Sequence, residues 1–170
     1  ISACLVGSEM CIRDSYPPLE SLSPDNIRAA VREAGIVGLG GAVFPTHVKL
    51  QPPKDKPIKS VILNGCECEP MITCDYRLMI ENPQEILFGM KAIMKAVAAE
   101  EGFIGIENNK PDAIKIMKEV TKSKSNIKVI EVKTKYPQGG EKQLIKVILN
   151  LEVPSGGLPY DVHVLVQNVG

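Results

Sequence analysis

Four glycines fall within seven residues of this sequence, at Gly35, Gly38, Gly40 and Gly41. Glycine tolerates positive φ and lets a ligand approach the backbone without a side chain in the way. Successive free N–H groups in such a turn form a concavity that suits phosphate oxygens. Lys49 would add a positive charge for the same anion. The segment predicts an anion-binding turn, although the same glycines also fit a plain connection after a helix.

A second polar segment follows the first predicted strand. Asn64 stands at the end of that strand, and Glu67 and Glu69 lie in the loop after it. An asparagine amide offers donors and an acceptor to the polar edge of a flat heterocycle. Ligands of open α/β sheets bind at the carboxyl ends of strands, which is where this loop lies. The loop is therefore a candidate binding segment, and the alternative is a solvated acidic turn.

The cysteines and histidines do not predict a metal site or a nucleophile. Structural zinc and iron–sulfur sites use four ligands at wider spacing than Cys66, Cys68 and Cys74 offer. We interpret these cysteines as small buried side chains or incidental thiols in a reducing compartment. His47 and His163 have no nucleophile beside them in the sequence, so we predict no catalytic side chain.

Strands and helices alternate along the chain and would bring these segments together. Cap residues followed by proline mark several helix starts, and apolar residues recur at helical spacing after them. We expect helices over 24–34, 83–100, 111–120 and 144–149, and strands over 60–64, 102–106, 127–132 and 162–170. Charged residues on both faces of 127–132 indicate a strand near a sheet edge.

This order predicts an α/β fold: a mostly parallel sheet with helices on both faces and right-handed crossovers. The turns at 65–70 and 136–141 then follow the first and third strands at the same edge. We expect the glycine-rich segment to join them there and form one cleft.

Composition excludes some partners. Lys plus Arg and Asp plus Glu number 20 each, so the net charge is zero and argues against nucleic acid. No apolar run is long enough to span a membrane, which argues against direct insertion. Residues 1–15 read differently from the rest and resemble a translated transposase sequencing adapter. We expect a non-native or disordered segment there and one domain over 16–170.

Four segments, at 38–49, 64–70, 136–145 and 166–170, together resemble the C subunit of the Rnf-type NADH:ferredoxin oxidoreductase. That protein is in turn similar to the flavin-bearing, NADH-binding subunit of respiratory complex I. The electron-transfer protein associated with proline reductase in clostridia shares the same motifs and is the nearest alternative.

The resemblance implies the fold of the complex I FMN-binding domain, bound FMN, and NADH as hydride donor. No side chain then acts as acid or base, because the protein supplies position and electrostatics. Residues for the FMN phosphate and ribityl chain would be Gly38, Gly40, Gly41 and Lys49, with Asn168 at the phosphate end. Residues around the flavin and nucleotide would be Asn64, Glu67, Tyr136, Gly139, Gly140 and Phe44, which would stack. Residues that orient NADH would be Glu69 and Glu141.

This sequence departs from the family pattern at two positions. Val43 stands where the family often has glycine, and a β-branched residue resists positive φ, so we expect a local difference in the loop. Cys66 stands where the complex I relative has an acid. The family also carries 4Fe–4S clusters on a later cysteine-rich domain, so we expect those clusters beyond Gly170. We expect residues 16–170 to be an FMN- and NADH-binding domain that is truncated at both ends.

The expected function is an FMN-binding electron-transfer domain that accepts a hydride from NADH and passes electrons toward clusters outside this segment. Its partners would be the other subunits of a membrane-bound electron-transport complex. The location would be cytoplasmic, peripheral on the inner face of the cell membrane through those subunits. The alternative is a nucleotide- or flavin-binding module or scaffold without activity.

Overall fold

A computed structural model describes residues 17–39 and 42–170 of the chain, so the adapter-like segment 1–15 lies outside the described residues. Four parallel strands form one sheet in the order β3-β2-β1-β4. The strands are β1 Ser60–Gly65, β2 Glu101–Glu107, β3 Ile127–Val132 and β4 Val164–Asn168. The structure confirms the predicted parallel sheet and the edge position of the third strand.

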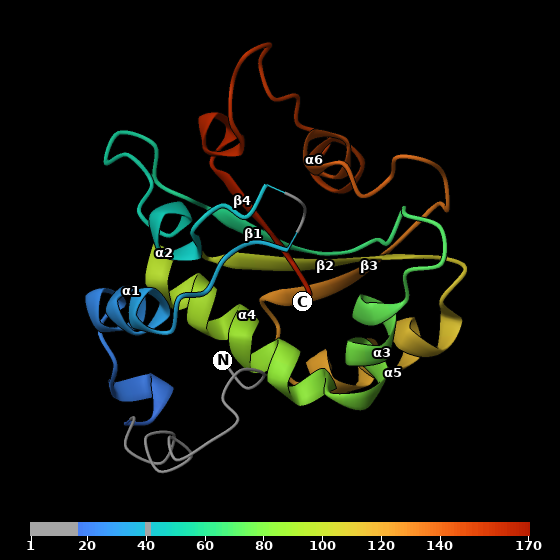
Figure 1. The fold of residues 1–170 in the computed structure, drawn as a ribbon, viewed down its shortest axis with the longest axis horizontal. Helices are drawn as coiled ribbons and strands as arrows, with labels where there is room; N and C mark the ends of the chain where they lie inside the picture. The colour runs from blue at the N-terminus through green and yellow to red at the C-terminus, as the bar shows by residue number, and fades with distance from the viewer. Residues whose placement is uncertain (1–16, 40–41) are drawn as a thin grey trace.

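In the described residues, six α-helices and two short 3-10 helices connect and cover the strands (Figure 1). The α-helices are α1 Pro24–Glu33, α2 Thr46–Lys49, α3 Cys74–Glu81, α4 Pro83–Val97, α5 Pro111–Thr121 and α6 Glu141–Leu149. The 3-10 helices are η2 Leu19–Ser21 and η3 Pro159–Val162. Helices α1, α4, α5 and α6 are the predicted ones, whereas α2 and α3 were not predicted.

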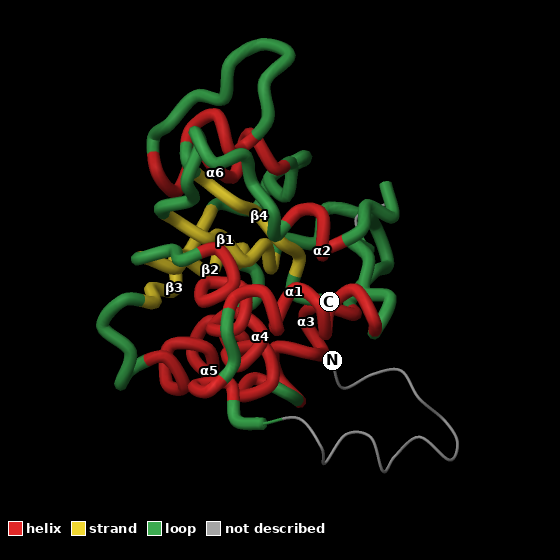
Figure 2. The backbone as a smooth tube through the Cα atoms, turned by 90° about the vertical axis from the view of Figure 1, so that its left-hand side faces the viewer, coloured by secondary structure: helices red, strands yellow, loops and turns green. Residues whose placement is uncertain are grey.

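The sheet separates two cores, which confirms that helices cover both faces. Figure 2 shows α6 on one side of the strands and α4 and α5 on the other. Because side chains alternate along a strand, Val61 and Leu63 of β1 face the larger core, while Ile62 faces the smaller one. Helices α1, α3, α4 and α5 contribute to the larger core, and Leu144 and Ile145 of α6 fill the smaller one.

The last strand is shorter than the predicted range 162–170. Val162 ends η3, and His163 takes a left-handed conformation with φ of 60° before β4 begins. The His163 carbonyl accepts the N–H groups of Lys59 and Ser60, and its Nδ1 lies 2.8 Å from the Pro57 carbonyl oxygen. These contacts place His163 in a structural turn at the start of the sheet.

Among the helices of the described part, none has the length and apolarity needed to cross a bilayer.

The glycine-rich segment begins where α1 ends. Gly35, with φ of 65°, donates to the Arg32 carbonyl, and Ile36 donates to the Val31 carbonyl. These two bonds form a Schellman helix end, in which glycine at the left-handed position avoids a steric cost. The chain then folds back on itself, because Gly38 donates to the Phe44 carbonyl at 2.9 Å.

Val43 occupies the left-handed region in this returning loop, with φ of 51°. Val43 therefore adopts a left-handed backbone conformation, which a β-branched residue was expected to resist. Such a conformation is unfavourable for any residue with a Cβ and most unfavourable for a β-branched one. The side chain is 60% exposed, so contacts with the core do not offset this cost.

We predict that Val43→Gly is more stable than Val43→Ala by up to about 1 kcal/mol, because only glycine avoids the left-handed penalty. The same pair at exposed Val147 within α6 provides the control, where glycine should be about 1 kcal/mol worse than alanine. Urea titration of all four variants measures both differences. If alanine were more stabilising than glycine at both positions, the cost assigned to the Val43 conformation would be wrong.

Candidate functional site

Asn64 joins three segments at the carboxyl edge of the sheet. The side chain is buried at the end of β1, and its Nδ2 donates to the Gly139 carbonyl at 2.9 Å. The same nitrogen lies 3.3 Å from Oδ1 of Asn168, at the end of β4, and Asn64 Oδ1 accepts the Cys66 N–H. The structure thus brings together three of the residues predicted for the flavin.

The glycine-rich segment reaches the same edge through one ion pair. Lys49 Nζ lies 3.0 Å from Oε1 of Glu141, the first residue of α6, and both side chains are about one-third exposed. Gly140, directly before Glu141, is the N-cap of that helix and follows Gly139. The predicted residues of the two glycine-containing segments therefore meet.

Within the described ranges, the other predicted residues form no hydrogen bond or ion pair with this group. Gly38 is half-buried and pairs with Phe44, whose ring is half-exposed. Glu69 and Tyr136 are exposed, Tyr136 to 82%. Gly40 and Gly41 lie outside the described residues. Their assignments to FMN or NADH stay predictions.

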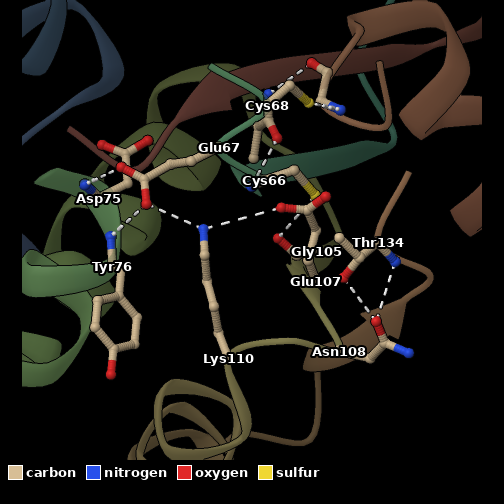
Figure 3. Close-up of polar contacts among 12 residues, drawn as sticks. Cys66, Glu67, Cys68, Asp75, Tyr76, Gly105, Glu107, Asn108, Lys110 and Thr134 are labelled. Carbon is tan, nitrogen blue, oxygen red and sulfur yellow. Dashed lines mark hydrogen bonds and ion pairs between the residues drawn. The ribbon is translucent and has the colours of Figure 1, made fainter. Parts of the chain in front are cut away.

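Glu67 faces away from this group and into a buried charge cluster. Lys110 Nζ lies 3.0 Å from Glu67 Oε2 and 3.9 Å from Glu107 Oε2, and both carboxylates are less than 5% exposed. The Glu67 carboxylate also accepts the N–H groups of Asp75 and Tyr76 at the start of α3. Figure 3 shows Lys110 between the two glutamates. Glu67 thus supplies the cap that the Thr73 side chain does not give α3.

Burial and charge set the protonation of this cluster. Burial would raise the pKa of Glu67, but Lys110 and the two N–H groups outweigh it and lower that pKa. Burial raises the pKa of Glu107, with Lys110 opposing. Burial also raises the pKa of the Cys66 thiol to about 12. Cys66 is therefore a neutral thiol at physiological pH and no nucleophile.

Three potential metal-ligand atoms, from Glu67, Cys74 and Asp75, lie within 4.8 Å of one another. The Glu67 oxygens already accept hydrogen bonds from Lys110 and two backbone N–H groups. The neighbouring ammonium group would also repel a cation. We assign no metal to this cluster.

Two buried polar side chains lack a partner. In the part of the chain that the structure describes, the buried side-chain N and O atoms without a hydrogen bond are Thr46 Oγ1 and both polar atoms of the Gln138 amide. Thr46 belongs to the glycine-rich segment and Gln138 directly precedes Gly139. A buried polar atom without a partner costs about 1–3 kcal/mol. Both glycine-containing segments therefore carry an unsatisfied group.

Sequence reasoning missed Gln138, Glu107 and Lys110 as residues of this edge. Gln138 lies within the matched 136–145 segment, so the motif itself was a signal. Glu107 and Lys110 gave no such signal, because Lys110 resembles a solvated residue before a helix. Only the fold shows that its side chain turns inward between two carboxylates.

Two surface hollows lie away from this group. One, of about 410 Å³, is lined by Lys91, Lys95, Lys124 and the first residue of β3, at the amino ends of the strands. The other, of about 700 Å³, lies between α1 and α2 beside Arg32 and His47. Neither is lined by a residue predicted to bind flavin or NADH.

We expect Lys110→Met to lower the free energy of unfolding at pH 7 by about 3–5 kcal/mol, because two buried carboxylates lose their cation. The lowered pKa of Glu67 makes its ionised form stabilising, so this contribution is present above the unfolded pKa and is lost as pH falls through the lower folded pKa. The difference between variant and wild type should therefore shrink on acidification. Urea titrations from pH 7 to about pH 3, below the ordinary glutamate pKa of about 4.3, measure it.

Lys146→Met is the control, because Lys146 pairs with Glu152 on the surface. That variant should stay close to wild type at each pH, since exposed pairs contribute little. A Lys110→Met variant as stable as Lys146→Met would contradict the role given to the buried cluster.

Known proteins show which family the chain belongs to. The family model for the Nuo51 FMN-binding domain matches residues 31–170. The C subunit of the proton-translocating ferredoxin:NAD(+) oxidoreductase complex of Clostridium ljungdahlii is 53% identical over 151 residues, which cover 89% of this chain and 33% of the relative. The C subunit of the Na(+)-translocating ferredoxin:NAD(+) oxidoreductase complex of Acetobacterium woodii is 52% identical over 155 residues. These cover 91% of this chain and 35% of the relative.

A solved structure shares the fold. The NAD+-reducing NiFe hydrogenase in its air-oxidised state superposes with a TM-score of 0.71 at 23% identity, over 96% of this chain and 33% of that chain. This chain spans about a third of the length of the curated relatives named above. The chain belongs to the Nuo51 FMN-binding domain family, and within it resembles the C subunit of the ion-translocating ferredoxin:NAD(+) oxidoreductases.

Proposed function

We propose that this domain binds FMN at the carboxyl edge of its sheet and accepts a hydride from NADH. The observation that carries the proposal is the pair of unsatisfied polar side chains, Thr46 and Gln138, one in each glycine-containing segment. Buried polar groups are normally paired, so an unpaired group in each segment favours a polar ligand between them. The family match to an FMN-binding domain supports the same ligand.

The donor set fits a phosphorylated flavin. Lys49 offers a cation to a phosphate. Asn168 offers its amide N–H groups to the flavin or its ribityl chain, and Asn64 holds Asn168 in place through its own amide. Phe44 is half-exposed, which leaves its ring free to stack on a nucleotide.

Bound FMN would supply the hydride acceptor and the means to release electrons one at a time. The residues of this chain would hold the two reactants rather than transfer protons. Lys49 and the glycines would fix the phosphate end, and Asn64 would fix the flavin against β1. Glu69 and Glu141 would orient NADH. Correct placement of the two rings is the contribution that the protein makes to the rate.

Electrons would pass to 4Fe–4S clusters in a region of the longer protein outside this chain. The relatives are subunits of ion-translocating complexes by name, which supports other subunits as partners. We place the domain on the cytoplasmic face of the cell membrane, held there peripherally by those subunits. The relative associated with proline reductase would share the flavin chemistry and differ in its partners.

We predict that the purified chain quenches FMN fluorescence with one-to-one stoichiometry, and that NADH bleaches the bound flavin under anaerobic conditions. Bound FMN that NADH cannot reduce would favour the binding module over the electron-transfer domain. A folded chain that binds neither FMN nor NADH would contradict the proposal, with circular dichroism used to verify folding.

Lys49→Met should weaken FMN binding by about 10- to 100-fold, because a charge-assisted contact to phosphate is lost. Riboflavin has no phosphate, so its affinity should not change. Lys54→Met, at an exposed lysine of the next connection, serves as the control. Equal losses for FMN and riboflavin, measured by fluorescence titration, would contradict the assignment of Lys49 to the phosphate.

A further inference from the structure

The backbone of Gly139 is held at its N–H and at its carbonyl by the end of β1 and the loop that follows it. Its carbonyl accepts from Asn64 Nδ2 at 2.9 Å, and its N–H donates to Cys68 Sγ at 2.9 Å. The two contacts come from residues four positions apart, at the end of β1 and in the loop beyond it. The two backbone groups of this one residue therefore fix the 136–140 turn to the β1 loop.

This approach requires glycine at position 139. A Cβ there would lie 2.8 Å from the Cys66 carbonyl oxygen and 3.1 Å from Cys68 Sγ. Contacts this short force a shift, and the first of them is to rigid backbone. Glycine at position 139 therefore allows the two protein segments to pack closely. This packing brings the Cys68 sulfur within hydrogen-bond distance of the Gly139 N–H.

Cys68 also stands apart from the other two cysteines of the loop. Cys66 is buried and its Sγ lies 3.8 Å from the Gly105 carbonyl, while Cys74 is exposed at the start of α3. Cys68 is half-buried and lies on the other side of the loop from Lys110 (Figure 3). Its sulfur is directed to the turn that carries Gln138 and Gly140.

We propose that Cys68 is a positioning residue for the flavin site, whose thiol holds the 136–140 turn against the β1 loop. The inference rests on the proposed FMN site, since Asn64, Gly139 and Gly140 belong to both. The sulfur acts as a hydrogen-bond acceptor and undergoes no covalent step. Without the Cys68 sulfur, the Gly139 backbone keeps only the contact of its carbonyl with Asn64. The turn then loses its fixed place beside the ligand.

Three variants test the proposal. Cys68→Ala removes the acceptor, and Cys68→Ser restores one of similar size. Cys74→Ala removes a nearby thiol at the start of α3, whose sulfur contacts Glu67 and Asp75. Cys68→Ala should raise the Kd for FMN and the exchange rate of the Gly139 amide hydrogen by about 3- to 10-fold each. Cys68→Ser should stay within about twofold of wild type in both, and Cys74→Ala should match wild type.

The two readouts separate this inference from the proposed function. If wild type binds no FMN, the proposed function fails and the flavin role of Cys68 fails with it. If wild type binds FMN and Cys68→Ala matches it in affinity and exchange, the inference is wrong while the proposed function stands. A Cys68→Ser variant as impaired as Cys68→Ala would also overturn it, because a hydroxyl can accept the same N–H.

Discussion

The buried contact between Lys110 and Glu67 is the interaction on which the carboxyl edge of the sheet depends. Glu67 belongs to the loop after β1, Glu107 ends β2, and Lys110 lies in the connection after β2. Glu67 also caps α3, where it accepts the N–H groups of Asp75 and Tyr76. One ammonium group thereby ties the ends of β1 and β2 together. Burying such charges is costly, so the cluster is held only while every partner stays in place.

This cluster and the candidate flavin site use opposite sides of one loop. Glu67 turns toward Lys110, whereas Asn64 and Cys68 turn toward Gly139. A loop anchored on one side by charge can present the other side with fixed geometry, which ligand binding requires. Glu67, for which the resemblance implies a contact with the flavin, therefore has a structural role in this chain. Its ion pair with Lys110 holds the acidic loop in a fixed place.

The sequence predicted the parts of the fold that local patterns encode. Proline after a cap residue located α1 and α4, and the predicted strand 60–64 matches β1 to within one residue. Helix α3 was missed because its cap comes from Glu67, seven residues before Cys74, and Thr73 makes no cap bond. Lys110 was missed for a related reason: its partners are 43 residues away or on the preceding strand. Contacts of this kind exist only once the sheet has formed.

The glycine-rich segment differs from a Rossmann turn in what precedes it. A Rossmann turn joins a strand to a helix, whereas this segment leaves a Schellman helix end and folds back before the single turn of α2. Lys49, at the end of α2, then bonds to the first residue of α6. An NMR titration of the chain with FMN tests most directly whether this arrangement forms the flavin site. We predict that amide shifts cluster at Asn64, Gly139 and Asn168, and shifts confined to the lysine-lined hollow at Lys91 and Lys124 would contradict it.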